Sequence, residues 1–340
     1  MNRIVSPSVA LALGLALNAP ASNRPAYAPP KPSAGVEALK LDWHDAKRDR
    51  AVPVKIYFPK DGAGALPIVI FSHGLGGSRD GYEFLGRHWA GCGYASVHLQ
   101  HIGSDSAVWR DAGAGEGGKA LQKSGANLAN SINRPLDVRL AIDELIRLND
   151  DAKSPLKGRL DAKRIGMAGH SFGGYTTLAV AGQTFPLLAG ETKLDDPRVK
   201  AATQMSAPAF NLRAQLDKSY GSITIPVMHM TGTKDFVPLF PQTTVEDRRI
   251  PYDHMNNAET CFVNFIDGDH MIFAGAPRLR EDEQAKDRTF QSLICAGTTA
   301  FWDAYLKGNA AAKSWLLDGG YAKLLGDLAK FEHKRPAATK

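Results

Sequence analysis

One short segment of the sequence carries the residue types that a serine nucleophile needs. Residues 169–174 read Gly-His-Ser-Phe-Gly-Gly, which places Ser171 at the centre of a G-x-S-x-G pattern. An apolar run at residues 165–168 precedes it and a helical pattern follows, the context in which a sharp strand-to-helix turn exposes a serine hydroxyl. Side chains at Gly169 and Gly173 would obstruct such a turn. The pattern therefore predicts that Ser171 is a nucleophile rather than a capping serine in a glycine-rich turn.

A serine at its ordinary pKa is a weak nucleophile and needs a base beside it. In the fold that carries such a turn, the partners follow in the order serine, acid, histidine. His270 lies in a Gly-Asp-His-Met segment after the last expected strand, whereas His254 lies in an insertion and His333 in the C-terminal tail. We therefore expect His270 to be the general base. The alternative is that His270 caps a helix.

The acid expected to orient His270 is Asp235, the last residue of a Thr-Gly-Thr-Lys-Asp segment. It follows the strand expected at residues 225–230, so it would lie at the same edge of the sheet and stabilise the cationic imidazole. Asp267 and Asp269 are the competing acids, but they are too close in sequence to His270 to reach its far nitrogen. The alternative for Asp235 is a plain turn residue.

Two backbone N–H groups must converge on the substrate oxygen to stabilise the negative charge that develops there. We expect one from Phe172, directly after the nucleophile, and the other from Leu75 in the His-Gly-Leu-Gly-Gly segment at residues 73–77. A glycine-rich loop also suits phosphate, but the Lys-Ser/Thr pair of a P-loop is missing. His98 and His101 have no clear third ligand, so we expect no metal and no cofactor.

The elements expected to position these residues alternate between short β-branched runs and helical patterns. Strands are expected at residues 51–58, 67–72, 94–99, 164–168, 199–205, 225–230 and 261–266, and helices at 82–91, 134–148, 173–182 and 284–306, with helical pattern to 330. Asn133 is expected to cap the 134–148 helix, with Pro135 in its first turn. The alternation predicts an α/β fold with a mostly parallel sheet of about eight strands covered by helices on both faces. With the serine turn at Ser171, this arrangement resembles the α/β-hydrolase fold.

Two segments, residues 103–133 and 236–259, are too long for simple connections between these elements. Both leave the carboxyl ends of expected strands, which is the edge where ligands bind in open α/β sheets. We expect their large apolar side chains, Trp109, Phe236 and Phe240, to line a substrate pocket. That pocket would take a neutral acyl group of short to medium length. The alternative is that these side chains only anchor long loops.

The first residues are typical of a secretory signal peptide, with a positive start, an apolar run at residues 9–17 and an Ala-Pro-Ala segment ending at Ala21. The run is shorter than the roughly 20 apolar residues that a membrane span needs. We expect residues 1–21 to be a signal peptide, 22–35 a flexible leader, 36–330 a single domain and 331–340 a tail. The protein is then secreted or periplasmic, without stable membrane insertion after cleavage.

The formal net charge is +6, from 41 basic and 35 acidic residues, and the basic residues form no stripe interleaved with aromatic side chains. We therefore expect no nucleic-acid partner, and no obligate protein partner is evident.

The chain has three cysteines, Cys92, Cys261 and Cys295. In an oxidising compartment two of them could pair. Cys92 adjoins a strand that we expect to be buried, so Cys261 and Cys295 are the favoured pair, although connectivity cannot be read from sequence.

Together these motifs resemble bacterial esterases grouped with dienelactone hydrolases and platelet-activating-factor acetylhydrolases, over residues 36–306. The resemblance implies a serine carboxylic-ester hydrolase that acts on a small-molecule ester through an acyl-enzyme, with Ser171, His270 and Asp235 as its triad. Dienelactone hydrolase itself has a cysteine nucleophile, where this chain has Ser171. The plasma acetylhydrolase places its acid after the preceding strand, where residues 205–208 read Met-Ser-Ala-Pro. A peptidase or amidase of the same fold, and a non-catalytic binding protein, are the alternatives.

Overall fold

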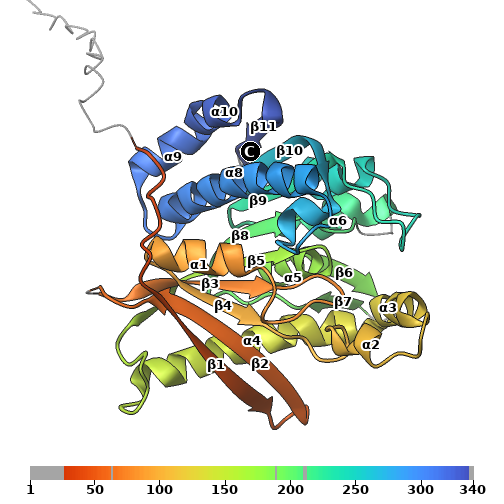
Figure 1. The fold of residues 1–340 in the computed structure, drawn as a ribbon, viewed down its shortest axis with the longest axis horizontal. Helices are drawn as coiled ribbons and strands as arrows, with labels where there is room; N and C mark the ends of the chain where they lie inside the picture. Colours follow the sequence, from red (N-terminus) through yellow and green to blue (C-terminus); the bar gives the residue numbers. More distant parts are fainter. Residues whose placement is uncertain (1–26, 63, 188–189, 210–212, 337–340) are drawn as a thin grey trace, which may run out of the picture.

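A nine-stranded sheet runs through the molecule in the order β1-β2-β4-β3-β5-β8-β9-β10-β11 (Figure 1). The computed structural model describes residues 27–62, 64–187, 190–209 and 213–336, so the expected signal peptide lies outside the described residues. The strands are β1 (Val36–Asp45), β2 (Arg50–Pro59), β3 (Leu66–Ser72), β4 (Ala95–Leu99), β5 (Leu160–His170), β8 (Val199–Met205), β9 (Val227–Lys234), β10 (Thr260–Asp269) and β11 (Ala329–Lys334). A separate hairpin pairs β6 (Thr184–Leu187) with β7 (Gly190–Lys193).

Helices connect most of these strands. The α-helices are α1 (Glu83–Gly91), α2 (Ala107–Arg110), α3 (Gly117–Gly125), α4 (Leu128–Asp150), α5 (Phe172–Ala181), α6 (Leu216–Gly221), α7 (Ile250–Asp253), α8 (Glu281–Tyr305), α9 (Ala310–Leu317) and α10 (Gly320–Leu325). Short 3-10 turns are η1 (Arg213–Gln215), η2 (Glu246–Arg249), η3 (His270–Phe273) and η4 (Gly326–Leu328). In the part of the chain that the structure describes, no helix is both long enough and apolar enough to cross a bilayer.

The centre of the sheet is parallel. The six strands from β4 to β10 in the sheet order all pair in parallel, while β1, β2 and β11 pair antiparallel at the two margins. All five residues of β4 are buried, as expected of a strand covered on both faces. The α/β-hydrolase prediction of a mostly parallel sheet is thus confirmed, with nine strands in place of about eight.

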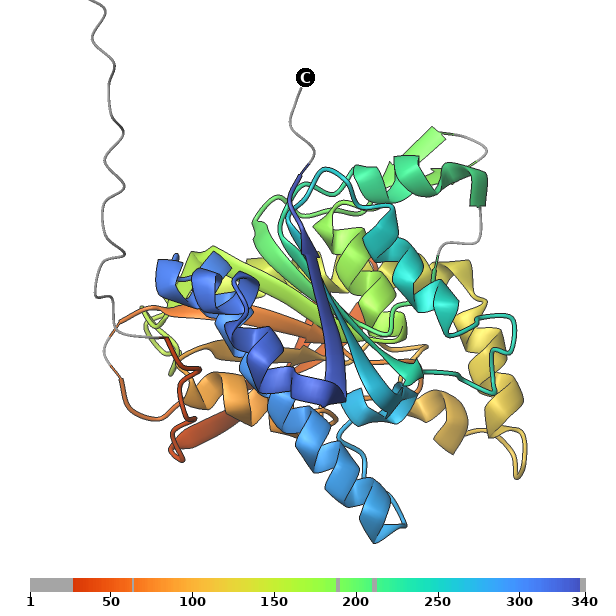
Figure 2. The same cartoon turned by 90° about the horizontal axis from the view of Figure 1, so that it is seen from above.

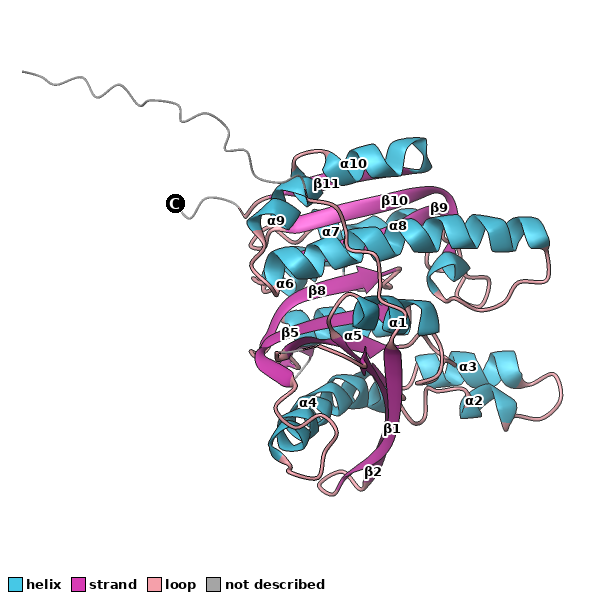
Figure 3. Ribbon diagram, turned by 60° about the vertical axis from the view of Figure 1, so that its left-hand side comes forward, coloured by secondary structure: helices cyan, strands magenta, loops and turns pink. Residues whose placement is uncertain are grey.

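Helices cover both faces of the sheet (Figures 2 and 3). Neighbouring residues of β3 show the two layers, because successive side chains of a strand point to opposite faces. Phe71 belongs to the core cluster that contains Trp89 of α1 and Trp302 of α8. Ile70 belongs to the cluster that contains Ile142 of α4. Each face of the sheet therefore carries its own apolar core.

Helix α4 begins earlier than expected, and the prediction that Asn133 caps it is wrong. The cap is Asn127, whose side chain accepts a hydrogen bond of 2.9 Å from the amide of Ala129. Pro135 consequently lies inside the helix, where it lacks the N–H that would bond the carbonyl of Ser131. The hydroxyl of Tyr175 lies 3.5 Å from that carbonyl and donates to it instead. A partner from α5 thus compensates for the proline.

The sequence analysis predicted neither of the two edge strands of the sheet, β1 and β11. The burial of β1 alternates irregularly along an exposed edge, which weakens the apolar signal of a strand. At the other margin, β11 pairs with β10 through residues 329–334 and replaces the end of the helical pattern expected to residue 330. The 103–133 segment also contains more regular structure than expected, since it carries α2, α3 and the first turn of α4.

The described part of the expected leader lies against the domain. The hydroxyl of Tyr27 donates a hydrogen bond of 2.8 Å to Asp303 of α8, and its ring packs against Trp315 at 5.7 Å between centroids. The amide of Ser33 bonds the carbonyl of Gly91 at 2.9 Å.

All three cysteines are buried free thiols in the structure. The disulfide favoured between Cys261 and Cys295 is therefore not formed. Cys261 lies on β10 and Cys295 within α8, and both belong to the apolar core on the same face of the sheet.

Candidate active site

Ser171 occupies a strained turn between β5 and α5. Its backbone has φ 57° and ψ −118°, a region that residues with a side chain rarely adopt. The turn is closed by the amide of Ser171, which bonds the carbonyl of Met205 at 2.8 Å. A Cβ at Gly169 would lie 2.2 Å from the carbonyl oxygen of Gly173, and one at Gly173 would lie 1.8 Å from that of Ser72. No side chain fits at either glycine, so both positions require glycine. The backbone strain at Ser171 is typical of a functional residue.

His270 and Asp235 are in direct contact. Asp235 follows β9 and His270 follows β10, so these parallel neighbours bring the two side chains to the same edge of the sheet. Nδ1 of His270 lies 2.7 Å from Oδ1 of Asp235. A carboxylate can only accept a hydrogen bond, so Nδ1 carries the proton and Nε2 is left as the basic nitrogen.

The same histidine lies beside the serine turn. The ring of His270 is 4.5 Å from that of His170, measured between centroids, and His170 directly precedes Ser171. The structure thus gathers Ser171, His270 and Asp235 from three different strand ends. Through its contact with His170, the imidazole of His270 lies next to the turn that carries Ser171.

Asp235 is fully buried and is held by more groups than the sequence indicated. Its Oδ2 accepts hydrogen bonds from the hydroxyls of Ser206 and Thr231, the latter at 2.7 Å. The guanidinium of Arg248 lies 3.5 Å from Oδ1. Burial raises the pKa of Asp235, but the bond from His270 and the charge of Arg248 outweigh it and hold that pKa well below the ordinary value.

The two competing acids are engaged elsewhere. Asp267 is exposed and forms an ion pair of 2.7 Å with Lys234. Asp269 caps η3 by accepting from the amide of Met271 at 2.8 Å, and pairs with Arg278 at 2.7 Å. Neither carboxylate contacts the imidazole of His270, whereas Asp235 does.

The glycine-rich loop after β3 passes next to the serine turn. A Cβ at Gly74 would lie only 3.3 Å from the Cβ of Ser171. Within the described residues, the amides of Leu75 and Phe172 have no hydrogen-bond acceptor, while the amide of Gly74 bonds the hydroxyl of Tyr82 at 3.1 Å and that of Gly76 bonds the carbonyl of Ser104 at 2.9 Å. The two N–H groups expected to meet a substrate oxygen are thus free to do so.

His73 fixes the orientation of one of these amides. Its Nδ1 donates a hydrogen bond of 2.6 Å to the carbonyl of Gly74, and its Nε2 accepts one of 3.1 Å from the amide of His101. The carbonyl of Gly74 and the N–H of Leu75 belong to one planar peptide unit and point in opposite directions. By holding the carbonyl, His73 therefore directs the N–H of Leu75 away from the loop.

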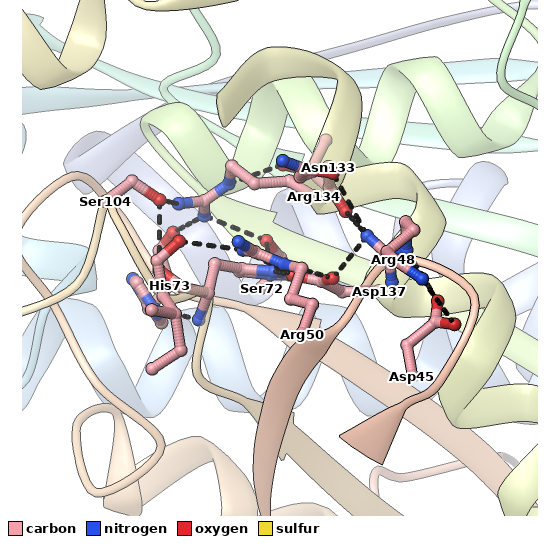
Figure 4. Close-up of polar contacts among 12 residues, drawn as sticks. Asp45, Arg48, Arg50, Ser72, His73, Ser104, Asn133, Arg134 and Asp137 are labelled. Carbon is pink, nitrogen blue, oxygen red and sulfur yellow. Dashed lines mark hydrogen bonds and ion pairs between the residues drawn. The ribbon is translucent and has the colours of Figure 1, made fainter. Parts of the chain in front are cut away.

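A completely buried arginine of α4 contacts this loop (Figure 4). Arg134 of α4 donates to the carbonyl of His73, to the hydroxyl of Ser104 at 2.8 Å and to that of Thr176 at 2.9 Å. Its guanidinium lies 4.5 Å from the ring of Phe172. Burial lowers the pKa of Arg134 to about 9, so it stays cationic at neutral pH. The sequence placed Arg134 only as the start of a helix, and its role emerges from contacts with three other elements.

The two histidines considered as metal ligands have structural partners. His101 donates from Nδ1 to Asp137 at 2.9 Å and bonds Ser72 through Nε2 at 2.9 Å. Nε2 of His98 lies 3.1 Å from the hydroxyl of Ser96. Across the described residues, no three or more His, Cys, Asp or Glu side chains gather as a metal site would require.

Two of the three expected pocket residues lie against the glycine-rich loop. Nε1 of Trp109 donates a hydrogen bond of 2.9 Å to the carbonyl of Gly76, although the side chain is 46% exposed. The ring of Phe240 and the side chain of Leu75 both border Gly125, within 3.3 and 3.1 Å of its Cβ position. Phe236 follows Asp235 and is 45% exposed, pointing outward at the same edge of the sheet.

Comparison with known proteins relates both halves of the chain to esterases. Residues 125–280 match the PET hydrolase-like family, and residues 45–117 match the family of platelet-activating factor acetylhydrolase, isoform II. The chain is 28% identical to the platelet-activating factor acetylhydrolase of Cavia porcellus over 163 residues, which is 41% of this chain and 36% of that protein. For the same enzyme of Canis lupus familiaris the identity is 30% over 138 residues, 33% of this chain and 31% of that protein.

The matched region thus spans about a third of the length of each of these curated relatives. The two family matches together cover the loop after β3, the serine turn and the segment that carries Asp235 and His270. Together with the nine-stranded, mostly parallel sheet, these matches make the chain similar to serine esterases of the α/β-hydrolase fold.

Proposed function

We propose that the protein hydrolyses carboxylic esters through an acyl-enzyme formed on Ser171. The hydroxyl of Ser171 attacks the ester carbonyl while Nε2 of His270 takes its proton, and His270 then gives this proton to the departing alcohol. Water activated by the same nitrogen releases the acid and restores Ser171. The observation that carries the proposal is the strained turn at Ser171 beside the 2.7 Å contact between His270 and Asp235.

We assign the stabilisation of the negative charge on the substrate oxygen to hydrogen bonds from the N–H groups of Leu75 and Phe172. Their lack of an acceptor among the described residues and the proximity of the Gly74 backbone to Ser171 support this assignment. Pre-oriented donors of this kind stabilise the tetrahedral intermediate more than the planar ester, and a single donor contributes about 100- to 1,000-fold in rate.

For the substrate we propose a small, neutral ester with a short to medium acyl group. Trp109, Phe236 and Phe240 present apolar surface at the carboxyl edge of the sheet, which favours an uncharged group over an anionic one. The matched families, PET hydrolase-like and platelet-activating factor acetylhydrolase, are both esterases and differ in the substrate that their names give. We therefore propose ester hydrolysis for this chain, and not the particular substrate of either family.

A panel of nitrophenyl esters with rising acyl length, measured beside a nitroanilide, tests this function. Ser171→Ala serves as the blank. Esters should turn over with an initial burst of nitrophenol equal to the enzyme present, and the anilide should be much slower. Ser171→Ala should lose nearly all turnover while keeping its circular dichroism spectrum. If it kept more than about a tenth of the wild-type kcat on every ester, Ser171 would not be the nucleophile.

We also infer that residues 1–21 are a signal peptide and that the mature protein, a single domain after a short leader, is secreted or periplasmic. The charge and apolar pattern of the N-terminal segment supports this. Sequencing the N-terminus of protein recovered from the medium or periplasm of expressing cells tests it. A start near residue 22 is expected, and an intact Met1 on exported protein would contradict cleavage.

A further inference from the structure

Four elements converge on the carboxylate of Asp235, and one of the contributing groups is a second buried charge. His270 of η3, Thr231 of β9 and Ser206, directly after β8, supply the hydrogen bonds already described. The fourth group is Arg248 of η2, which is 3% exposed. A cation buried this deeply has lost its hydration, which is costly. Its position beside Asp235 therefore suggests a role in the site.

Arg248 is fixed by two contacts near the same carboxylate. Its Nη1 donates a hydrogen bond of 2.9 Å to the carbonyl of Ser206, and its Nε lies 3.5 Å from Oδ1 of Asp235. This is the oxygen that accepts from Nδ1 of His270. Ser206 itself has φ 54°, an uncommon backbone conformation. In it, the hydroxyl donates to Asp235 and the carbonyl accepts from Arg248. The imidazole therefore bonds this oxygen of Asp235, and the guanidinium of Arg248 lies beside the same oxygen without a hydrogen bond from Nε.

Comparison with the neighbouring Arg249 shows that η2 directs only the side chain of Arg248 into the protein. Arg249 points to the outside, where it pairs with Glu332 of β11 at 2.6 Å and with Asp253 at 2.9 Å. Its side chain is 38% exposed, against 4% for Arg248. Two adjacent arginines thus have opposite environments, and only the first faces Asp235.

The charged and titratable groups around His270 come from each element packed against it. Asp235 favours the cationic imidazole, and Arg248 opposes it. The ring of His170, held by the hydroxyl of Tyr82, contributes no charge, because burial holds the pKa of His170 well below its ordinary value. Asp269, beside His270 in sequence, is neutralised by its ion pair with Arg278. Arg248 is therefore the cation that lies beside the acid partner of His270, and Asp247 of η2 is the other acid that acts on it.

We propose that Arg248 is a positioning residue for the triad acid, whose guanidinium holds Asp235 toward His270 and whose charge opposes protonation of His270. This inference rests on the proposed function, because it assigns a role within the same site. A base acts only in its neutral form, so the charge of Arg248 extends activity to lower pH than Asp235 alone would allow. Little water screens the pair, which makes this effect larger than for a surface charge.

The test is the dependence of kcat/KM on pH, between about pH 5 and 9, on a nitrophenyl acetate. Arg248→Gln removes the charge, Arg248→Lys retains it, and Arg249→Gln is the matched control on the same turn. In Arg248→Gln the fall of kcat/KM at low pH should move to higher pH by about half a unit to one unit. In Arg248→Lys and Arg249→Gln it should stay within about 0.2 units of the wild type.

An unchanged low-pH fall in folded Arg248→Gln would overturn the inference, because a structural role would lower activity equally at every pH. If Arg248→Gln does not fold, Arg248→Lys decides: an upward shift as large as the one expected for glutamine would show that the charge is not responsible. Failure of the proposed function looks different. In that case wild-type protein would not turn over the ester, or Ser171→Ala would turn it over equally well.

Discussion

The hydroxyl of Tyr82 lies 2.9 Å from Nδ1 of His170 and also accepts a hydrogen bond of 3.1 Å from the amide of Gly74. One phenol therefore joins the glycine-rich loop after β3 to the residue that precedes Ser171. Both partners are buried, so neither has water as a substitute. The relative position of the serine turn and the loop depends on this oxygen.

Tyr82→Phe should lower kcat by about tenfold, with a smaller change in KM, because the N–H of Leu75 would no longer be held against the serine turn. It should also lower the free energy of unfolding by about 1–3 kcal/mol for the unpaired buried groups. Ester kinetics and urea unfolding measure the two effects. Tyr94→Phe is the control, since it removes an equally buried hydroxyl bonded to Asp303 at 2.6 Å, and it should change stability without changing kcat.

Asp235→Asn should lower kcat by about a thousandfold or more, because an amide presents a donor to Nδ1 and favours the wrong tautomer of His270. Asp267→Asn and Asp269→Asn are the comparisons. The first loses only an exposed ion pair and the second an anchor of η3, so each should keep activity within about tenfold of the wild type. A loss at Asp269 as large as that at Asp235 would transfer the role of the acid.

Trp109→Ala should change the preference for acyl length, because it removes apolar surface beside the glycine-rich loop. Each methylene contributes about 1–3 kcal/mol of discrimination at most. Trp109→Phe keeps a ring and loses only the hydrogen bond to Gly76, so it should change the preference less. The measurement is kcat/KM across the ester series. An unchanged preference with a lower melting temperature would mean that Trp109 only anchors its loop.

Stability should fall between about pH 6.5 and 4, because buried histidines resist protonation. Burial lowers the pKa of His98 and His229 to about 3, and that of His88 and His101 to about 4. The unfolded chain binds these protons first, so stability is complete above the unfolded pKa and is lost as the pH falls toward the folded values. Each of these histidines lowers the free energy of unfolding by about 1.4 kcal/mol for every pH unit of acidification in that window.

Urea unfolding followed by tryptophan fluorescence at several pH values measures this dependence. His229→Gln should make it less steep by about one proton, since one of the buried groups is removed. A free energy of unfolding that stays constant from pH 7 to about pH 5 would contradict the prediction.

The three thiols should react slowly with DTNB in the folded protein. All three are buried, and burial raises the pKa of Cys92 to about 11 and the pKa of Cys261 and Cys295 further above the ordinary value. Thiolate is the reactive form, so both access and ionisation are reduced. Three thiols should appear on addition of denaturant. A count of one under denaturing conditions without reductant would indicate a disulfide.

The sequence predicts the parts of this molecule whose signals are local. The turn at Ser171 follows from its two flanking glycines, and the strand ends before Asp235 and His270 follow from short apolar runs. Helix α4 shows the limit of such reading. Pro135 looked like a first-turn residue, but a hydroxyl from α5 satisfies the carbonyl that the proline leaves free, and no pattern within the helix reveals that contact.

The supporting groups of the site could not be predicted for the same reason. Arg248 and Arg249 are adjacent and chemically identical in the sequence, and only their contacts in the fold, with the carbonyl of Ser206 and with Glu332 of β11, give them opposite environments. Arg134 and Tyr82 likewise act through partners that are distant in sequence.

The chain enters the fold at the edge of the sheet opposite to Ser171. Tyr27 is tied to Asp303, and Ser33 is bonded next to Gly91, just before β4 begins, whereas Ser171, Asp235 and His270 follow the ends of their strands. In Figure 1 the described N-terminal segment and helices α2 and α3 accordingly lie on opposite sides of the molecule. A handle joined ahead of Tyr27 would therefore hold the enzyme on a solid support with its catalytic edge turned toward the solution.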